Sequence, residues 1–311
     1  MTESRDGPST GGSGCPTNFF SDSTYTMSNL KPERCATARS FLFVPANRPD
    51  RFDKALNSGA DVIILDLEDS VPSQDKALAR EAVSACWQAI AQQDVCVVVR
   101  INAEGSPEWN ADIELVSRLP GLGGILLPKA ERTSTLELLG ERLRGIRILA
   151  LIESAAGLDN LKAIAGMPNV VRLVVGHIDF MADTGIACSE DERELDPLRF
   201  AVSMASRGAG LAPPVDGVTV QTTDARRLAA DTLRGKRFGF AGKLCIHPQQ
   251  VAGVHAAFAP SANDVLWARR VLEADAASNG AAVQLDGRMV DLPVVLQARR
   301  TLAMVGTSIE P

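Results

Sequence analysis

The sequence predicts an α/β fold, namely a (β/α)₈ barrel of the TIM-barrel type that is followed by a C-terminal helical appendage. Eight short runs rich in Val, Ile and Leu alternate with amphipathic stretches between residues 40 and 258. Such runs are typical of strands that are buried on both faces. A charged residue follows or closes six of the runs, at Asp66, Arg100, Lys129, Glu153, Asp179 and Lys243. Barrel enzymes place their chemistry at the carboxyl ends of their strands, so this recurrence favours a barrel with an active site.

The main alternative is an open doubly wound sheet. That fold usually has fewer strands and a glycine-rich first turn. Neither GxGxxG nor GxxxxGK[ST] occurs in the chain, so the sequence does not support a dinucleotide site or a phosphate-binding P-loop.

The elements follow one another in a regular order. Strands are expected at 40–45, 61–66, 95–101, 123–128, 146–153, 170–177, 216–221 and 239–246. Helical periodicity is found at 50–57, 73–91, 133–143, 158–165, 262–277 and 292–305. Residues 280–290 have the turn chemistry of a short hairpin, with Asp286-Gly287 at its tip.

These elements divide the chain into three parts. Residues 1–38 are rich in Ser, Thr, Gly and Pro, and are expected to form a disordered tail. Residues 39–258 are expected to form the barrel. Residues 259–311 are too few to fold alone, so this appendage is expected to pack on the barrel or on a neighbouring subunit.

Composition excludes several classes of function. The chain has 311 residues and a net charge of −6 with no basic block, which argues against nucleic acid as a partner. No apolar run is long enough to span a membrane, and the N-terminus lacks the pattern of a secretory signal. The six cysteines contain no CxxC pair, which favours the reducing cytoplasm over a disulfide framework.

Two of the charges at the strand ends suggest a metal site. Glu153 and Asp179 would close the fifth and sixth strands, so their carboxylates would lie close together. Two such carboxylates repel unless a proton or a cation intervenes, and Mg²⁺ typically takes one or two carboxylates and fills its other positions with water and substrate. The alternative is that both acids cap the helices that follow them.

Arg100 strengthens the interpretation of an active site, because a guanidinium after three valines is costly to bury without an anionic partner. It is suited to polarising a carbonyl or holding a carboxylate. The alternative is a structural ion pair with Asp66 or Glu68, which lie in an acidic turn with Asp69. Lys129 is expected to play a supporting role.

The histidines do not indicate zinc, because none of them shows HxxxH spacing. His177 falls within the sixth predicted strand and is expected to pack inside the fold.

Seven motifs resemble those of the citrate lyase beta-subunit-like family, within the broader aldolase/citrate lyase superfamily of metal-dependent barrels. The resemblance extends from Arg39 to about Val305. The motifs are R-S-F-L-F-V-P-A-N-R-P-D-R-F (39–52), G-A-D-V-I-I-L-D-L-E-D-S-V (59–71), V-V-V-R-I-N (97–102), I-L-L-P-K-A-E (125–131), L-I-E-S-A-A-G (151–157), G-H-I-D-F-M-A-D-T-G (176–185) and G-F-A-G-K-L-C-I-H-P-Q-Q (239–250).

The resemblance implies a role for individual residues. Glu153 and Asp179 match the two protein ligands of Mg²⁺, and Arg100 matches the residue that binds the substrate carbonyl and stabilises an enolate. Supporting roles fall to Asp66, counted with the catalytic residues, and to Glu68, Arg39 and Lys129, counted with the substrate-binding ones. The segment 287–295 is similar to the appendage of citramalyl-CoA and malyl-CoA lyases, in which an aspartate, here Asp291, acts as acid/base in the active site of a neighbouring subunit.

The activity implied is that of a Mg²⁺-dependent carbon–carbon lyase. It would cleave a 3-hydroxyacyl-CoA thioester, of the malyl-CoA or citramalyl-CoA type, to acetyl-CoA and a 2-oxo acid, or condense them. A homo-trimer or hexamer is expected. The alternatives are a citryl-thioester lyase subunit, hydrolysis of the thioester as in malate synthase-like or thioesterase members, and a non-catalytic assembly subunit.

Overall fold

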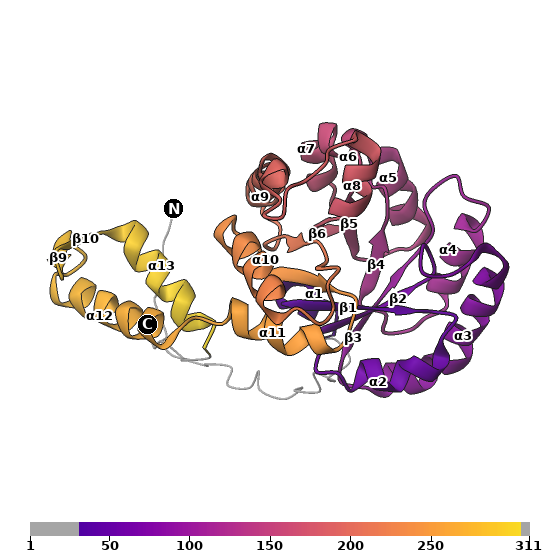
Figure 1. The fold of residues 1–311 in the computed structure, drawn as a ribbon, viewed down its shortest axis with the longest axis horizontal. Helices are drawn as coiled ribbons and strands as arrows, with labels where there is room; N and C mark the ends of the chain where they lie inside the picture. The colour runs from indigo at the N-terminus through magenta and orange to yellow at the C-terminus, as the bar shows by residue number, and fades with distance from the viewer. Residues whose placement is uncertain (1–30, 306–311) are drawn as a thin grey trace, which may run out of the picture.

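A computed structural model describes residues 31–305 and confirms the predicted barrel. Eight parallel strands close in sequence order, from β1 next to β2 round to β8 next to β1 (Figure 1). The strands are β1 (Ser40–Pro45), β2 (Val62–Asp66), β3 (Cys96–Arg100), β4 (Gly124–Leu127), β5 (Ile148–Ile152), β6 (Val170–Val175), β7 (Val215–Asp216) and β8 (Gly242–Cys245).

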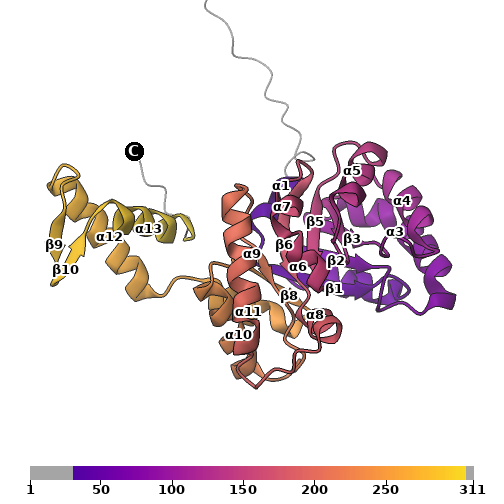
Figure 2. The same cartoon turned by 90° about the horizontal axis from the view of Figure 1, so that it is seen from above.

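Helices surround the strands on the outside, as Figures 1 and 2 show. Three 3₁₀ turns, at Pro49–Arg51, Ser73–Asp75 and Arg193–Leu195, precede α2, α3 and α9. The helices around the barrel are α1 (Lys31–Thr37), α2 (Phe52–Leu56), α3 (Lys76–Gln92), α4 (Trp109–Ser117), α5 (Thr133–Arg142), α6 (Ala155–Asp159), α7 (Leu161–Ala165), α8 (His177–Thr184), α9 (Asp196–Gly208), α10 (Ala225–Arg237) and α11 (Gln249–Phe258).

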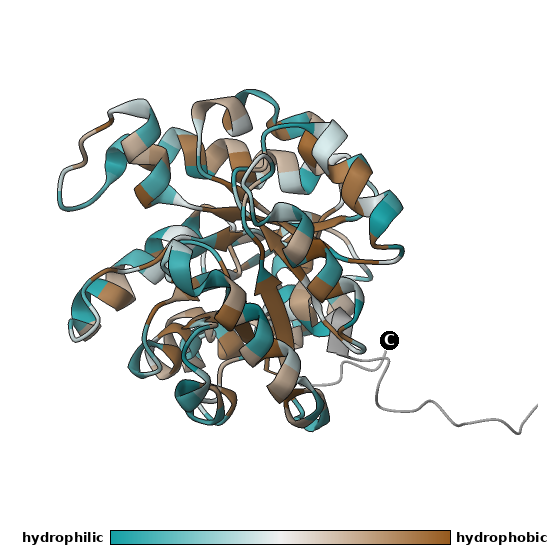
Figure 3. Ribbon diagram, turned by 90° about the vertical axis from the view of Figure 1, so that its right-hand side faces the viewer, coloured by the Kyte–Doolittle hydropathy of each residue, from teal (hydrophilic) through white to brown (hydrophobic). Residues whose placement is uncertain are grey.

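Alternation along the strands separates two apolar layers. Side chains such as Phe41, Ile64 and Val98 fill the interior of the barrel, whereas their neighbours, such as Leu42 and Ile63, pack between the strands and the helices. Figure 3 shows the consequence, with hydrophobic strands at the centre and hydrophilic residues on the outer turns of the helices. Because successive strand residues face opposite ways, the position of a charge along its strand decides which layer it enters.

Lys243 illustrates this rule and corrects one prediction. It lies within β8 rather than at its carboxyl end, and it is fully buried. Its ammonium donates to the carbonyl of Gly217 at 2.7 Å, in a charged sector where Arg199 binds both Asp216 and Glu192. Lys243 therefore belongs to the packing of the barrel near β7 and β8, and not to the row of charges at the strand ends.

The N-terminal end of the barrel is closed by α1, and we call this end the floor. Arg172 of β6 is fully buried there, and its guanidinium donates to the carbonyls of Cys35, Ala38 and Pro213. The guanidinium also lies 5.2 Å from the centre of the Phe41 ring. Residues 31–37 thus form a helix where a disordered tail was expected, and the floor holds the carbonyls of Cys35 and Ala38. Residues 1–30 lie outside the described part.

Three further sequence predictions need correction. The sixth strand ends at Val175, so His177 begins α8, although its side chain is buried as expected. The seventh strand is limited to Val215–Asp216. The backbone N–H of Gly217, the next residue, donates to the side chain of Asp216 and not to a neighbouring strand. The helices α4, α9 and α10 were not expected from the sequence pattern.

The appendage is a small unit of its own. It consists of α12 (Ala262–Ala277), the hairpin strands β9 (Val283–Leu285) and β10 (Arg288–Val290), and α13 (Leu292–Ala303). Val271, Val290 and Leu302 are among the residues of its separate apolar core. Figures 1 and 2 both show this unit standing to one side of the barrel, beyond α11, rather than packed over it.

Candidate active site

The carboxyl end of the barrel, which we call the mouth, is centred on Arg100, the last residue of β3. Arg100 lies beside Asp66, the last residue of β2, because the two strands pair in register at these positions. Nε and Nη2 of Arg100 donate to the two carboxylate oxygens of Asp66, both at 2.7 Å. Burial alone would raise the pKa of Asp66, but the charge and hydrogen bonds of Arg100 outweigh burial and hold that pKa below its usual value. The pair is therefore ionised and fixed in orientation.

The third nitrogen of Arg100 faces two more acids. Nη1 lies 2.8 Å from Oε2 of Glu68 and 3.5 Å from Oδ2 of Asp69, whose side chain is 65% exposed. Burial and the neighbouring carboxylates raise the pKa of Glu68 to about 7 despite the nearby guanidinium. Burial would lower the pKa of Arg100, but Asp66, Glu68 and Asp69 together raise it, so the guanidinium stays charged. Nη1 of Arg100 thus lies on the side of the guanidinium that faces the open end of the barrel.

The acidic turn that carries Glu68 is held by Lys76 of α3. The ammonium of Lys76 donates to the carbonyls of Leu67 and Glu68 at 2.8 and 2.9 Å, and to Oδ1 of Asn102 at 2.7 Å. Asn102 in turn donates to Leu67 and to the buried Asp112. This clamp fixes the backbone that presents Glu68 to Arg100.

Glu153 follows β5 and is buried at the mouth. Its Oε1 accepts from the backbone N–H of Lys129 at 2.8 Å, and Lys129 has a positive φ of 44° that directs this N–H toward it. A side chain at Gly176 would lie 2.5 Å from Oε2 of Glu153, so only glycine leaves room for this carboxylate. Burial, and then the charges of Glu68 and Asp179, raise the pKa of Glu153 to about 8, although the Lys129 N–H opposes this.

Asp179 is not at a strand end, as the sequence suggested, but in the first turn of α8. Gly176 is the residue that precedes this helix and also the one that contacts Glu153, so one short segment brings the two acids together. The charge of Asp179 raises the pKa of both Glu153 and Glu68, which places all three carboxyl groups within electrostatic reach of one another. Asp179 does not cap α8 with its side chain.

These residues fit a hard divalent cation. Glu68, Glu153 and Asp179 lie within electrostatic reach of one another, and the guanidinium of Arg100 is already paired with Asp66, so the carboxyl groups of the mouth outnumber the cations that could neutralise them. Oε2 of Glu68 is buried, and its ion pair with Nη1 of Arg100 at 2.8 Å lacks the alignment of a hydrogen bond. Within residues 31–305 no cluster of three or more His, Cys, Asp or Glu side chains could hold a metal, but Mg²⁺ needs only one or two carboxylates and takes water and substrate for the rest.

Two of the predicted site residues do not join this cluster. Arg39 precedes β1, so it lies at the floor, where its Nε is 3.7 Å from Asp61. The predicted place of Arg39 near the substrate therefore disagrees with the fold. Asp291 precedes α13 on the appendage, outside the barrel of its own chain, and its side chain does not cap that helix. Lys129 lies at the mouth, but its side chain is exposed and only its backbone contacts Glu153.

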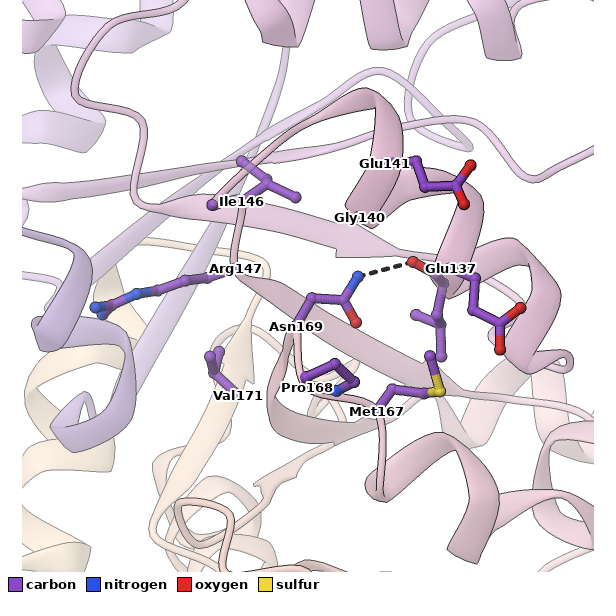
Figure 4. Close-up of a pocket in the computed structure, with 11 residues that line it drawn as sticks. Glu137, Gly140, Glu141, Ile146, Arg147, Met167, Pro168, Asn169 and Val171 are labelled. Atoms are coloured by element: carbon purple, nitrogen blue, oxygen red, sulfur yellow. Dashed lines mark hydrogen bonds between the residues drawn. The ribbon is translucent and has the colours of Figure 1, made fainter.

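Two hollows of the described surface lie away from the mouth. One of about 630 Å³ lies beside the N-terminal ends of β5 and β6 (Figure 4). Asn169 crosses it to donate to the carbonyl of Leu136 at 2.7 Å, and its lining is mainly apolar. A second, of about 510 Å³, lies at the floor beside Arg39. Neither contains the carboxylates of the mouth, so we place the reaction by its charged groups rather than by the depth of a hollow.

Lys76, Asn102 and Gly176 support the residues of the mouth, and the sequence analysis did not predict this role. Lys76 and Asn102 look like ordinary surface or loop residues, and Gly176 carries no chemistry. A signal was present for Gly176, which stands between a buried strand and an acid, where a glycine indicates close approach of another group. Nothing comparable marks Lys76.

Comparison with known proteins finds relatives that cover most of the chain. The family described as HpcH/HpaI aldolase/citrate lyase matches residues 39–248. The "Citrate lyase subunit beta-like protein" of Deinococcus radiodurans is 35% identical, over 86% of this chain and 97% of that protein. The "(3S)-malyl-CoA thioesterase" of Cereibacter sphaeroides is 31% identical over 85% and 93%, and the "L-malyl-CoA/beta-methylmalyl-CoA lyase" of Rhodobacter capsulatus 33% over 84% and 92%.

A solved structure is similar over nearly the whole fold. It is the CitE protein of Mycobacterium tuberculosis in complex with magnesium, acetoacetate and coenzyme A. The TM-score is 0.76 and the identity 32%, with 87% of this chain and 99% of that chain covered. Within residues 31–305, no helix is both long and apolar enough to cross a bilayer.

Proposed function

The chain belongs to the HpcH/HpaI aldolase/citrate lyase family, and we propose that it is a Mg²⁺-dependent carbon–carbon lyase. Its substrate is a 3-hydroxyacyl-CoA thioester of the malyl-CoA or citramalyl-CoA type. Cleavage yields acetyl-CoA and a 2-oxo acid, and the same site catalyses the reverse condensation. The observation that carries this proposal is the convergence of Glu153, Asp179 and Arg100 at the mouth, with the pKa of Glu153 raised to about 8 by burial and by neighbouring carboxylates.

Glu153 and Asp179 would hold the metal, with Glu68 beside them. Bound Mg²⁺ would act as a Lewis acid toward the oxygens of the substrate. The solved CitE structure, which contains magnesium, acetoacetate and coenzyme A, supports both the metal and a thioester of coenzyme A.

Arg100 is placed to bind the thioester carbonyl. Asp66 fixes the guanidinium with two hydrogen bonds, so Nη1 is already oriented before a substrate arrives. Cleavage of the carbon–carbon bond turns the thioester carbonyl into an enolate, and the fixed charge of Arg100 stabilises the oxygen on which negative charge develops. Substrate binding requires the carbonyl to displace Glu68 from Nη1, which the raised pKa of Glu68 favours because its protonated form is a weaker partner.

Asp291 completes the site from a neighbouring subunit. The enolate carbon needs a proton, and Asp291 stands on an appendage that extends away from its own barrel. Exposed apolar side chains flank it on both sides, with Met289 72% and Leu292 67% exposed, as expected of a surface that is covered in an assembly. We propose that Asp291 delivers this proton across a subunit interface in a homo-trimer or hexamer.

Hydrolysis of the thioester is the second candidate. The relative from Cereibacter sphaeroides that is named (3S)-malyl-CoA thioesterase covers as much of this chain as the lyase does, so similarity alone does not separate the two activities. In a hydrolase, water attacks the thioester carbonyl that Arg100 would hold, and free CoA is released. A citryl-thioester lyase is the third candidate, because a relative named citrate lyase subunit beta also matches most of this chain.

The two candidates differ in their products. The purified protein is incubated with Mg²⁺ and a panel of CoA thioesters that includes malyl-CoA, citramalyl-CoA and a citryl thioester, and both free CoA and 2-oxo acid are measured. Acetyl-CoA with an oxo acid supports the lyase, and free CoA without an oxo acid supports the hydrolase. No turnover of any thioester, in protein that is folded and binds Mg²⁺, would favour a non-catalytic assembly subunit.

The shared site has its own test. Asp291→Ala and Glu153→Gln proteins are each expected to be inactive, because one lacks the proton donor and the other the metal ligand. After subunit exchange, mixed oligomers regain activity at sites that combine an intact Glu153 with an intact Asp291. If exchange is verified and no activity returns, Asp291 does not act across an interface.

A further inference from the structure

Two cysteines meet at the floor of the barrel, at the end opposite to the proposed reaction. Cys35 lies in α1 and Cys96 is the first residue of β3, 61 residues away along the chain. Their sulfur atoms are 3.1 Å apart, and both side chains are fully buried. The cysteines of residues 31–305 are all free thiols, so this contact joins two reduced groups.

The backbone of Gly123 packs closely against the two sulfur atoms. A side chain at Gly123 would collide with Sγ of Cys96 and would lie 3.6 Å from Sγ of Cys35. The carbonyl of the same glycine lies 4.0 Å from Sγ of Cys35. The thiols are therefore held against each other by backbone, not by flexible side chains.

The surroundings make the two thiols unequal. The hydrogen bond with Cys96 lowers the pKa of Cys35, and the positive charges of Arg172 and Arg147 act in the same direction against the effect of burial. The same hydrogen bond, burial and the charge of Cys35 raise the pKa of Cys96. Cys35 is thus the nucleophilic sulfur of the pair, and Cys96 the one that keeps its proton.

We propose that Cys35 and Cys96 form a reversible dithiol–disulfide site that is oxidised by a peroxide and reduced by a thiol. In the first step the Cys35 thiolate attacks the O–O bond of hydrogen peroxide, which gives a sulfenic acid on Cys35 and releases hydroxide. In the second step the sulfur of Cys96 attacks the sulfenic sulfur, and its proton passes to the hydroxide that leaves Cys35. The proton that Cys35 lost on forming its thiolate neutralises the hydroxide released in the first step. The S–O bond breaks, the S–S bond forms, and hydrogen peroxide has been reduced to two molecules of water.

The geometry requires only a small movement. The sulfurs must close from 3.1 Å to about 2.05 Å, the length of a disulfide bond. The oxidant reaches the buried pair when α1 opens. This helix has only seven residues, and apart from the thiol contacts the polar contacts described between residues 34–38 and the barrel are those of Arg172 with the carbonyls of Cys35 and Ala38 and those of Arg34 with Asp94. Oxidation then ties α1 to β3 covalently.

Oxidation is tested in the full-length protein with Cys15, Cys86 and Cys188 replaced by serine. Cys35, Cys96 and Cys245 remain, and burial raises the pKa of Cys245 to about 12, which makes it an internal control. After treatment with hydrogen peroxide the number of free thiols in the denatured protein should fall from three to one, and mass spectrometry under non-reducing conditions should find the peptides of Cys35 and Cys96 linked. Dithiothreitol should restore all three thiols. We expect the melting temperature of the oxidised form to rise by about 5 °C, because the crosslink restricts the unfolded chain.

Single replacements separate the roles of the two thiols. In the same background, Cys96→Ser leaves no resolving thiol, so dimedone should trap a sulfenic acid on Cys35. Cys35→Ser should leave Cys96 unmodified. The proposal is overturned if folded protein keeps three free thiols under peroxide, if the linked peptides include Cys245, or if dimedone labels Cys96 rather than Cys35. Each of these measurements is independent of catalytic activity.

Discussion

The mouth and the floor of the barrel both bury charged groups, but they compensate them differently. At the floor, Arg172 is surrounded by carbonyls, and its pKa is lowered by burial. At the mouth, Arg100 faces more carboxylates than it can pair with, and the pKa values of Glu68 and Glu153 are raised to about 7 and about 8. The difference teaches that buried ionisable groups have two roles here: at the floor they join the elements of the fold, and at the mouth, in the function that we propose, the carboxyl groups are available to bind a cation.

The largest expected effect follows from changing Glu153 to Gln. Mg²⁺-dependent turnover should fall by about 10³-fold or more, because a metal ligand is lost. The folded protein should become more stable to heat at pH 8 without Mg²⁺, since the change removes a repelled carboxylate. Steady-state kinetics and calorimetry measure the two effects, and the exposed Glu137→Gln serves as control. Full activity of Glu153→Gln would disprove the metal assignment.

Arg172→Met tests the role of the buried guanidinium at the floor of the barrel. The carbonyls of Cys35, Ala38 and Pro213 lose their donor, so the free energy of unfolding should fall by about 2 kcal/mol. The kcat of the protein that remains folded should change by less than about threefold, because the mouth is untouched. Denaturant titration measures the loss, with Arg226→Met on the outer surface as control. A protein of unchanged stability would show that the floor does not depend on this guanidinium.

Lys76→Met tests the clamp behind the acidic turn. Without the ammonium, the carbonyls of Leu67 and Glu68 are no longer held, so the carboxyl group of Glu68 is no longer fixed beside Arg100. We expect kcat to fall about tenfold, the lower end of what a misplaced catalytic group costs, while the melting temperature changes little. The control is Lys54→Met, an exposed lysine of α2. Equal loss of stability and activity would mean that Lys76 supports the fold rather than the site.

The last prediction concerns the pH dependence of stability and of Mg²⁺ binding. The folded pKa values of Glu68 and Glu153, about 7 and about 8, lie above their ordinary values, so ionisation of these groups opposes folding. Their contribution to stability is therefore fully present below about pH 4.5 and is lost as pH rises through 8. Mg²⁺ binding should show the opposite trend and weaken by about fifty-fold from pH 8 to pH 6, because Glu153 is about half ionised at pH 8 and about 1% ionised at pH 6. Calorimetric titration measures it, and an affinity independent of pH in this range would contradict shared carboxylate ligands.

Some parts of the site could be predicted because their chemistry is written in short motifs. Asp66 and Arg100 close neighbouring strands of buried residues, and a parallel sheet brings such positions to one edge whatever the helices do. Arg39 was misplaced because the sequence shows that a charge adjoins a strand but not the end at which functional groups gather; it precedes β1 instead of following it. Asp179 was expected at the end of the sixth strand but lies in the first turn of α8, because the apolar run continues from β6 into α8.

The sequence by itself determined the barrel, the family and the residues that carry charge, because alternating apolar runs and short motifs are local properties of the chain. Only the tertiary structure decided which charges meet. Lys243 and Arg172 are buried in the layers of the barrel, Lys76 holds the acidic turn from a neighbouring helix, and Gly176 brings Glu153 toward Asp179. These contacts join residues that are distant in the chain, and their strength depends on burial and on the positions of other charges, which no local pattern records.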